Sequence, residues 1–139
     1  MSVVEDLYEY LVGEGVAAGS TGWTILRRRI MDAPAGDQLI VLTEDGGALP
    51  AIPAEEGIGA SAESDPAVQV RVRAKAWDGD ASAAKAGEIF TLLHGKRNLI
   101  MNGNLYLRVR AQTAQPVFMG FDSKSRPEHT ISFQFLTSL

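Results

Sequence analysis

Basic side chains recur at every second position in two stretches of the chain. Arg71, Arg73 and Lys75 alternate with small apolar residues in AVQVRVRAKAW, and Arg108 and Arg110 do the same in LYLRVRA. In a β-strand this spacing puts the cations on one face and the apolar side chains on the other. Cationic side chains attract phosphates and carboxylates. Such a strand face could therefore bind nucleic acid or an acidic protein surface.

A third basic group, Arg27 with Arg28 and Arg29, lies in TGWTILRRRIM, a stretch whose composition favours a strand. Specific reading of bases normally requires exposed aromatic side chains for stacking. Tyr106 is the one aromatic residue among the alternating cations. The sequence therefore favours generic attraction to phosphates or to an acidic protein over base recognition. A solvated sheet face that discourages edge pairing is the alternative.

Acidic residues are concentrated in one Gly-, Ala- and Pro-rich segment, residues 44–66, which contains no Lys or Arg. We expect a long loop between strands, because little in it is large enough to pack. Loops of this length tend to be functional or disordered. The candidate partner-contact residues of this loop are Glu44, Asp45, Glu55, Glu56, Glu63 and Asp65.

The histidines, serines and paired carboxylates of the sequence do not match the spacing of known catalytic or metal-binding motifs. His94 and His129 are the two histidines, and their spacing is unlike that of a metal site on one helix. No serine lies in a G-x-S-x-G motif, and the Glu55-Glu56 pair lies in the predicted loop, where little would separate the two pKa values. We expect no enzyme activity, no metal and no cofactor, and a structural role for both histidines.

The composition, with 139 residues of which 45% are apolar and 22% charged, is that of one globular domain spanning residues 1–139. No apolar run approaches the roughly 18 residues of a membrane span. The chain has no cysteine, which is compatible with a reducing compartment. The sequence predicts a protein that is used inside a cell and has no membrane partner.

The elements that position these residues follow from periodicity. Ser2 and Glu5 predict the start of a helix over about residues 3–13, and a second helix is expected from about 81 to 94, before Gly95. TGWTILRRRIM and QLIVLT could pair as a hairpin. Asn102-Gly103 predicts a hairpin between two strands, and TISFQFL alternates as a last strand. The order predicts an α+β fold: a mainly antiparallel sheet with helices packed on one face.

Several segments, taken in order, resemble a known family. TEDGGALP, PAVQVRVRAKAW, EIFTLLHGKRN and QPVFMGFDSKSRPEHTISFQFL together resemble the phage minor capsid family that includes siphophage tail terminators. The likeness runs from about Leu7 to Leu136. It implies an α+β subunit that forms a ring, typically a hexamer, on the end of a completed tail tube. Such a ring stops tube polymerisation and provides the head–tail joining surface.

The resemblance also implies partners and a location. The partners would be further copies of the chain, the tail tube protein, the head–tail connector or neck protein, and genomic DNA that passes through the lumen without sequence-specific binding. The protein would be assembled in the host cytoplasm and reside in the tail or neck of the virion. Another neck or head–tail completion subunit, and a monomeric nucleic-acid-binding module, are the alternatives. The candidate subunit-interface or lumen residues are Arg71, Arg73, Lys75, Arg108, Arg110, Arg27, Arg28 and Arg29.

Overall fold

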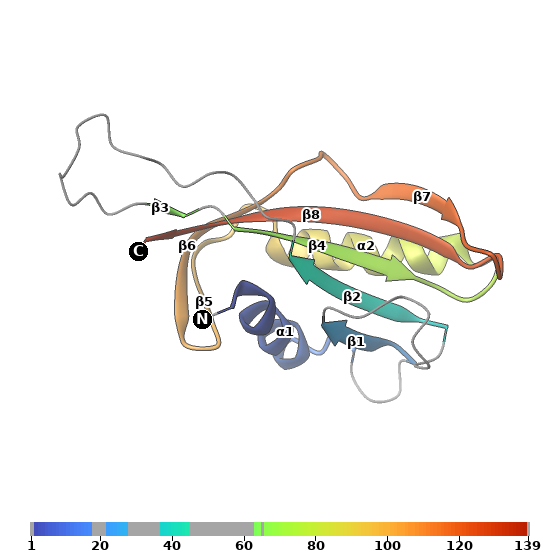
Figure 1. The fold of residues 1–139 in the computed structure, drawn as a ribbon, viewed down its shortest axis with the longest axis horizontal. Coiled ribbons are helices and arrows are strands. Elements are labelled where there is room, and N and C mark those ends of the chain that lie inside the picture. Colours follow the sequence, from blue (N-terminus) through green and yellow to red (C-terminus); the bar gives the residue numbers. More distant parts are fainter. Residues whose placement is uncertain (1, 18–21, 28–36, 45–62, 65, 139) are drawn as a thin grey trace.

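The computed structural model describes residues 2–17, 22–27, 37–44, 63–64 and 66–138. Within these ranges the chain forms two helices and one sheet, whose strand order is β1-β2-β4-β8-β6-β5, with β3 and β7 also paired to β8 (Figure 1). Every strand pair is antiparallel except β1 with β2. The predicted α+β fold with a mainly antiparallel sheet is confirmed. The elements are α1 (Val3–Gly13), β1 (Thr24–Arg27), β2 (Leu39–Glu44), β3 (Glu63–Ser64), β4 (Ala67–Arg73), α2 (Gly79–Leu93), β5 (Arg97–Met101), β6 (Asn104–Ala111), β7 (Val117–Phe121) and β8 (Pro127–Ser138).

Strand β8 is the longest strand and the centre of the sheet. Along one edge it pairs with β4, and β3 continues the same register toward the end of β8. Along the other edge it pairs first with β7 and then with β6. Residues far apart in the sequence are therefore joined through this one strand (Figure 1).

Both helices cover the apolar face of the sheet. Helix α1 begins at Ser2, whose side chain accepts a hydrogen bond from the Glu5 backbone N–H at 3.5 Å, and it buries one apolar stripe. Helix α2 begins at Asp78, whose carboxylate accepts from the Ala81 N–H at 3.2 Å, and it ends before Gly95 in left-handed conformation (φ 82°). The shared core contains Leu7, Leu11, Ile89, Leu93, Val68, Val70, Val72, Ile131, Phe133 and Phe135. Both predicted helices, and their position on one face, are confirmed.

The β5–β6 hairpin has the predicted two-residue turn. Asn102 and Gly103 both have positive φ, 51° and 79°, and Met101 pairs with Asn104. Positive φ at both central residues is the type I′ arrangement, which matches the twist of the strands.

The first two strands differ from the prediction. Strand β1 runs parallel to β2, with Thr24 opposite Leu39, so the predicted hairpin is wrong. Parallel neighbours need a crossover rather than a tight turn, and an apolar run does not encode the direction of its partner. The intervening residues 28–36 lie outside the described part.

Two strands were not predicted. β7 contains Pro-flanked, glycine-bearing sequence and pairs irregularly with β8 between Phe118 and Gly120, so the usual alternation is absent. β3 lies inside the segment predicted as one loop, residues 44–66, and β2 extends to Glu44. The predicted loop is therefore shorter at both ends, and residues 45–62 and 65 lie outside the described part.

Candidate functional site: the polar face of the sheet

The face of the sheet turned away from the helices is polar on β4 and β8, whereas on β2 the same face carries the buried Leu39 and Val41, opposite Arg73 and Arg71. On β4, Gln69 and Arg71 are partly exposed between buried valines, and on β8 Ser132 and Gln134 are partly exposed between buried Ile131, Phe133 and Phe135. Gln69 lies opposite Ser132 and Arg71 opposite Thr130, so these side chains share one face. The predicted division of the alternating strands into an apolar and a polar face is confirmed.

Three exposed arginines form what we call the arginine face: Arg97 on β5 and Arg108 and Arg110 on β6. Arg97 lies directly opposite Arg108. Arg110 donates two hydrogen bonds of 3.2 Å, from Nε and Nη2, to Oε1 of Gln134. Among the residues that the structure describes, none of the three forms an ion pair. Like charges directly opposite on neighbouring strands repel, so this surface would be stabilised by an anionic partner.

Arg97 was missed at the sequence level, although a signal was present. A two-residue turn at Asn102-Gly103 fixes the register of the hairpin, since Met101 must then pair with Asn104. Counting back along both strands from that pair places Arg97 opposite Arg108.

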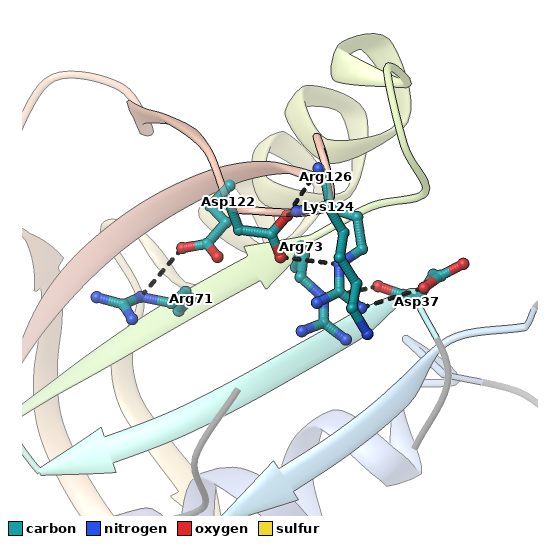
Figure 2. Close-up of polar contacts among 7 residues, drawn as sticks. Asp37, Arg71, Arg73, Asp122, Lys124 and Arg126 are labelled. Atoms are coloured by element: carbon teal, nitrogen blue, oxygen red, sulfur yellow. Dashed lines mark hydrogen bonds and ion pairs between the residues drawn. The ribbon is translucent and has the colours of Figure 1, made fainter. Parts of the chain in front are cut away.

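A network of ion pairs joins the turn after β7 to the start of β2 (Figure 2). Arg126 Nε lies 2.8 Å from Oδ2 of Asp122, and its Nη1 lies 3.2 Å from Oδ1 of Asp37. The other Asp122 oxygen accepts hydrogen bonds of 2.9 Å from the backbone N–H groups of Lys124 and Arg126. The Asp122 carboxylate therefore closes the turn that connects β7 to β8.

The pKa values in this network move in the direction that stabilises the charged pair. Burial alone would raise the pKa of Asp122, but hydrogen bonds from the backbone and side chain of Arg126 and from the Lys124 backbone outweigh it and lower that pKa. Burial would likewise lower the pKa of Arg126, but its hydrogen bonds to Asp122 and Asp37 raise it. Both groups are thus held ionised.

Arg73 belongs to this network and not to an exposed face. It is 1% exposed, and its Nε donates a 3.0 Å hydrogen bond to the backbone carbonyl of Asp37. Burial, with the nearby charge of Arg126, lowers its pKa below the usual value. The expectation that Arg73 projects from the same open surface as Arg71 is therefore wrong, because the turn after β7 and the start of β2 cover this end of β4 (Figure 2).

The two neighbours of Arg73 in the alternating stretch are placed differently. Arg71 is partly exposed, and its Nε lies 3.8 Å from Oε1 of Glu128 without a hydrogen bond. Lys75 is exposed but lies beyond the end of β4, in the connection to α2. The three predicted cations thus do not form one continuous surface.

Arg27 ties β1 to the first helix. Its guanidinium forms an ion pair with Glu5 and lies 4.2 Å from the ring centre of Tyr8. Of the other predicted residues, Glu44 is exposed at the end of β2 and Glu63 begins β3. The remaining predicted residues, Arg28, Arg29, Asp45, Glu55, Glu56 and Asp65, lie outside the described part.

Tyr106 does not offer an aromatic ring to the arginine face. It is buried, its ring packs edge-on against Phe135, and its hydroxyl donates to Asp6. The strong twist of the β5–β6 hairpin toward α1 accounts for this position (Figure 1). The expectation of an exposed stacking residue here is wrong.

Both histidines contact other parts of the fold. Nδ1 of His94 accepts a 3.0 Å hydrogen bond from the Ala111 N–H. Nδ1 of His129 lies 2.5 Å from Oγ of Ser82, which is fully buried on α2. A substrate could not reach this buried hydroxyl. The contact between Ser82 and His129 is therefore a structural one that joins α2 to β8.

Two further features bear on the class of protein. No three His, Asp or Glu side chains come together as a metal site in the described ranges. No helix in the same ranges is long and apolar enough to cross a membrane.

Comparison with known proteins identifies the family. The family model described as bacteriophage tail terminator protein matches residues 10–138, which include every strand and α2. No curated protein matches the chain. The resemblance found in the sequence is confirmed, and it makes the protein a structural component of the phage tail and hence of the virion. The chain belongs to the bacteriophage tail terminator family.

Proposed function

We propose that this chain assembles into a ring, a hexamer in the simplest case, that caps the tail tube, stops its polymerisation and provides the head–tail joining surface. The family match carries this proposal. A closed ring is built from heterologous contacts, in which one patch of a subunit fits a different patch on the next. The protein acts in this role by binding geometry, without catalysis.

The charge of the arginine face supports the proposal that this surface lines the lumen of the ring. Its three exposed cations have no acidic partner in the described ranges, so their charge can attract an anionic partner outside the subunit. A row of arginines attracts phosphates without regard to sequence, since the attraction comes from counterion release. Because Tyr106 is buried, it offers no ring for base stacking. These features fit genomic DNA that passes without sequence-specific binding.

The acidic segment, residues 44–66, remains a candidate surface for the tail tube protein or the connector. Its two described ends are Glu44, the last residue of β2, and Glu63, the first residue of β3. Complementary charge across such contacts sets register and partner choice more than affinity.

The proposal is tested by polymerising the tail tube protein with and without this chain and imaging the tubes by electron microscopy. Addition of the chain should give tubes that stop growing and carry ring-shaped density at one end. Tubes that elongate equally in both samples, with bare ends, would contradict a terminator role.

Further binding and mass measurements separate the alternatives. A neck subunit would bind the isolated connector and leave tube growth unchanged. A monomeric nucleic-acid-binding module would remain a monomer by light scattering and would bind DNA with an affinity that falls steeply with salt. A ring that binds both tube and connector supports the terminator assignment over both.

A further inference from the structure

Large apolar side chains are exposed mainly at two ends of the molecule. The first is what we call the aromatic patch: Phe118 and Phe121 on β7, with Trp77 from the connection between β4 and α2. Val117 and Met119 of β7 are exposed beside them. Ile100 and Leu105, which we call the aliphatic tip, lie at the end of the β5–β6 hairpin. Figure 1 shows β7 and the β5–β6 hairpin at opposite ends of the sheet. Exposed apolar clusters of this kind mark interaction surfaces.

The aromatic patch is contiguous. The ring centres of Trp77 and Phe121 lie 5.3 Å apart, and those of Phe118 and Phe121 lie 5.5 Å apart. Trp77 is 75% exposed and the two phenylalanines are each 51% exposed. Taking roughly 200 Å² for an aromatic side chain, these fractions leave about 350 Å² of aromatic surface in water. That is nearly half of the roughly 800 Å² per partner in a standard interface.

The patch lies along an open strand. Among the described residues β7 pairs with β8 alone, so its other edge presents unpaired backbone groups. Edge strands with apolar side chains pair readily with another chain, and proteins usually protect such edges with charges or bulges. Here one irregularity lies between Phe118 and Gly120, but the exposed side chains of β7 are apolar. An unpaired strand edge with exposed apolar side chains is typical of a surface that binds another chain.

The aliphatic tip consists of two exposed side chains at the end of a hairpin. Ile100 is 64% exposed and lies directly opposite Leu105, so the two side chains form one small apolar surface beside the turn. The other side of the hairpin is fixed to α1, because Asp6 accepts hydrogen bonds from Asn102, Asn104 and Tyr106. The tip is therefore rigid, which lowers the entropy cost of binding.

We propose that the aromatic patch of one subunit binds the aliphatic tip of the next copy of this chain. This inference rests on the proposed ring and names the contact that closes it. A head-to-tail ring requires two different surfaces on each subunit, at separate places. The two apolar surfaces are of that kind: one is aromatic and the other aliphatic, and they lie at opposite ends of the sheet. Phe121 lies between Trp77 and Phe118 in this cluster. An aromatic cluster that contains a tryptophan has the composition of a binding hot spot.

The test uses two charged variants, Trp77→Lys and Ile100→Lys, and measures mass by light scattering. Each variant alone should lose the ring and weaken self-association by roughly 30-fold or more, the loss typical of a hot-spot residue. Each retains one intact surface, however, so an equimolar mixture should form a one-to-one dimer. Met119→Lys and Leu105→Lys repeat the test at positions with other side-chain contacts. Val12→Lys, at an exposed apolar residue (49%) outside both surfaces, is the matched control and should form rings.

The outcomes separate this inference from the proposed function. If the wild type forms rings that cap tubes and all four charged variants do so too, the two surfaces meet another phage protein and the inference is wrong, while the terminator role stands. If Trp77→Lys is monomeric but Ile100→Lys is unchanged, the aromatic patch pairs with its own copy and the inference is again wrong. If the wild type forms no ring even on tubes, the proposed function fails.

Discussion

The hydroxyl of Tyr106 donates a 2.5 Å hydrogen bond to Oδ2 of Asp6, a residue 100 positions away in the chain. Asp6 is buried on α1, and its two oxygens also accept from the side-chain amides of Asn102 and Asn104 at 3.2 and 3.0 Å. Three donors from one hairpin thus converge on one carboxylate. A buried carboxylate is tolerated only when it is hydrogen-bonded in this way, so the network specifies how the hairpin lies on α1.

Replacing Tyr106 by Phe should lower the free energy of unfolding by about 1.5 to 3 kcal/mol, the range for a hydrogen bond to a charged group. The ring and its packing against Phe135 are retained, so the decrease reports the hydroxyl. Urea denaturation at pH 7 measures it. Tyr8→Phe is the matched control, since its ring can still lie beneath Arg27, and it should leave stability unchanged. Equal decreases in both variants would contradict a special role for Tyr106.

Alkaline pH should destabilise the protein in part through Tyr106. Burial, and then the hydrogen bond and charge of Asp6, raise the pKa of Tyr106 above its usual value of 10.0. The folded chain therefore keeps a proton that the unfolded chain loses above about pH 10, so stability falls as pH rises past that value. Tyr106→Phe should show a shallower fall between pH 9 and 11, roughly the onset of this window, measured by thermal midpoint. Parallel curves for the two proteins would show that Tyr106 does not contribute.

Acid should destabilise the protein in part through His129. Burial lowers the pKa of this histidine below its usual value of 6.5. The unfolded chain then binds a proton that the folded chain does not, so stability falls as pH drops below 6.5 and stops falling once the folded group also titrates. His129→Gln should flatten the curve of unfolding free energy in this window. His94→Gln, at a more exposed histidine, is the comparison, and a curve that His94→Gln flattens more would refute the assignment.

Arg126→Met should lower the free energy of unfolding by about 2 to 3 kcal/mol, because it leaves the Asp122 carboxylate with one charged partner fewer in a half-buried site. Lys124→Met, in the same turn, is the control. The Lys124 backbone N–H still reaches Asp122 in that variant, so little change is expected. A decrease of similar size in Lys124→Met would mean that general charge, and not the paired geometry of Arg126, stabilises the turn.

Arg108→Thr should raise the stability of the monomer by a few tenths of a kcal/mol while weakening DNA binding. It removes a like charge opposite Arg97, and such pairs are destabilising by roughly 0.2 to 1 kcal/mol. If Arg108 neutralises one phosphate, its removal should reduce the slope of log affinity against log salt by about 0.9. Chemical denaturation and DNA binding at several salt concentrations measure the two effects. Lower stability in this variant, or an unchanged salt slope, would contradict the role of the arginine face.

Local signals in the sequence were sufficient for the helices and the hairpin. The Ser2 cap, the left-handed Gly95 and the Asn102-Gly103 turn each depend on a few adjacent residues, and each was found where the residues indicate. The polar and apolar faces of β4 and β8 were predictable for the same reason, because successive side chains of a strand always point to opposite faces of the sheet.

The features that were missed depend on contacts between distant segments. Arg73 looks like Arg71 in the sequence, but it is buried because the start of β2, with Asp37, and the turn after β7 cover this end of β4. Tyr106 is likewise buried where its hydroxyl can donate to Asp6, a residue near the other end of the chain. The direction of β1 and the existence of β7 were also set by partners outside their own segments.

Strand β8 joins the two ends of the molecule, since it pairs with β7 near its start and with β6 toward its finish. Its hydrogen bonds to β7 and to β6 are perpendicular to its length, as in any antiparallel pair. A pull directed along β8 would therefore load these bonds in shear, all together, instead of opening them one at a time. If neighbouring subunits bind β7 and the β5–β6 hairpin, tension around a ring would be transmitted along β8 within each subunit. That is the direction in which the sheet resists force most strongly.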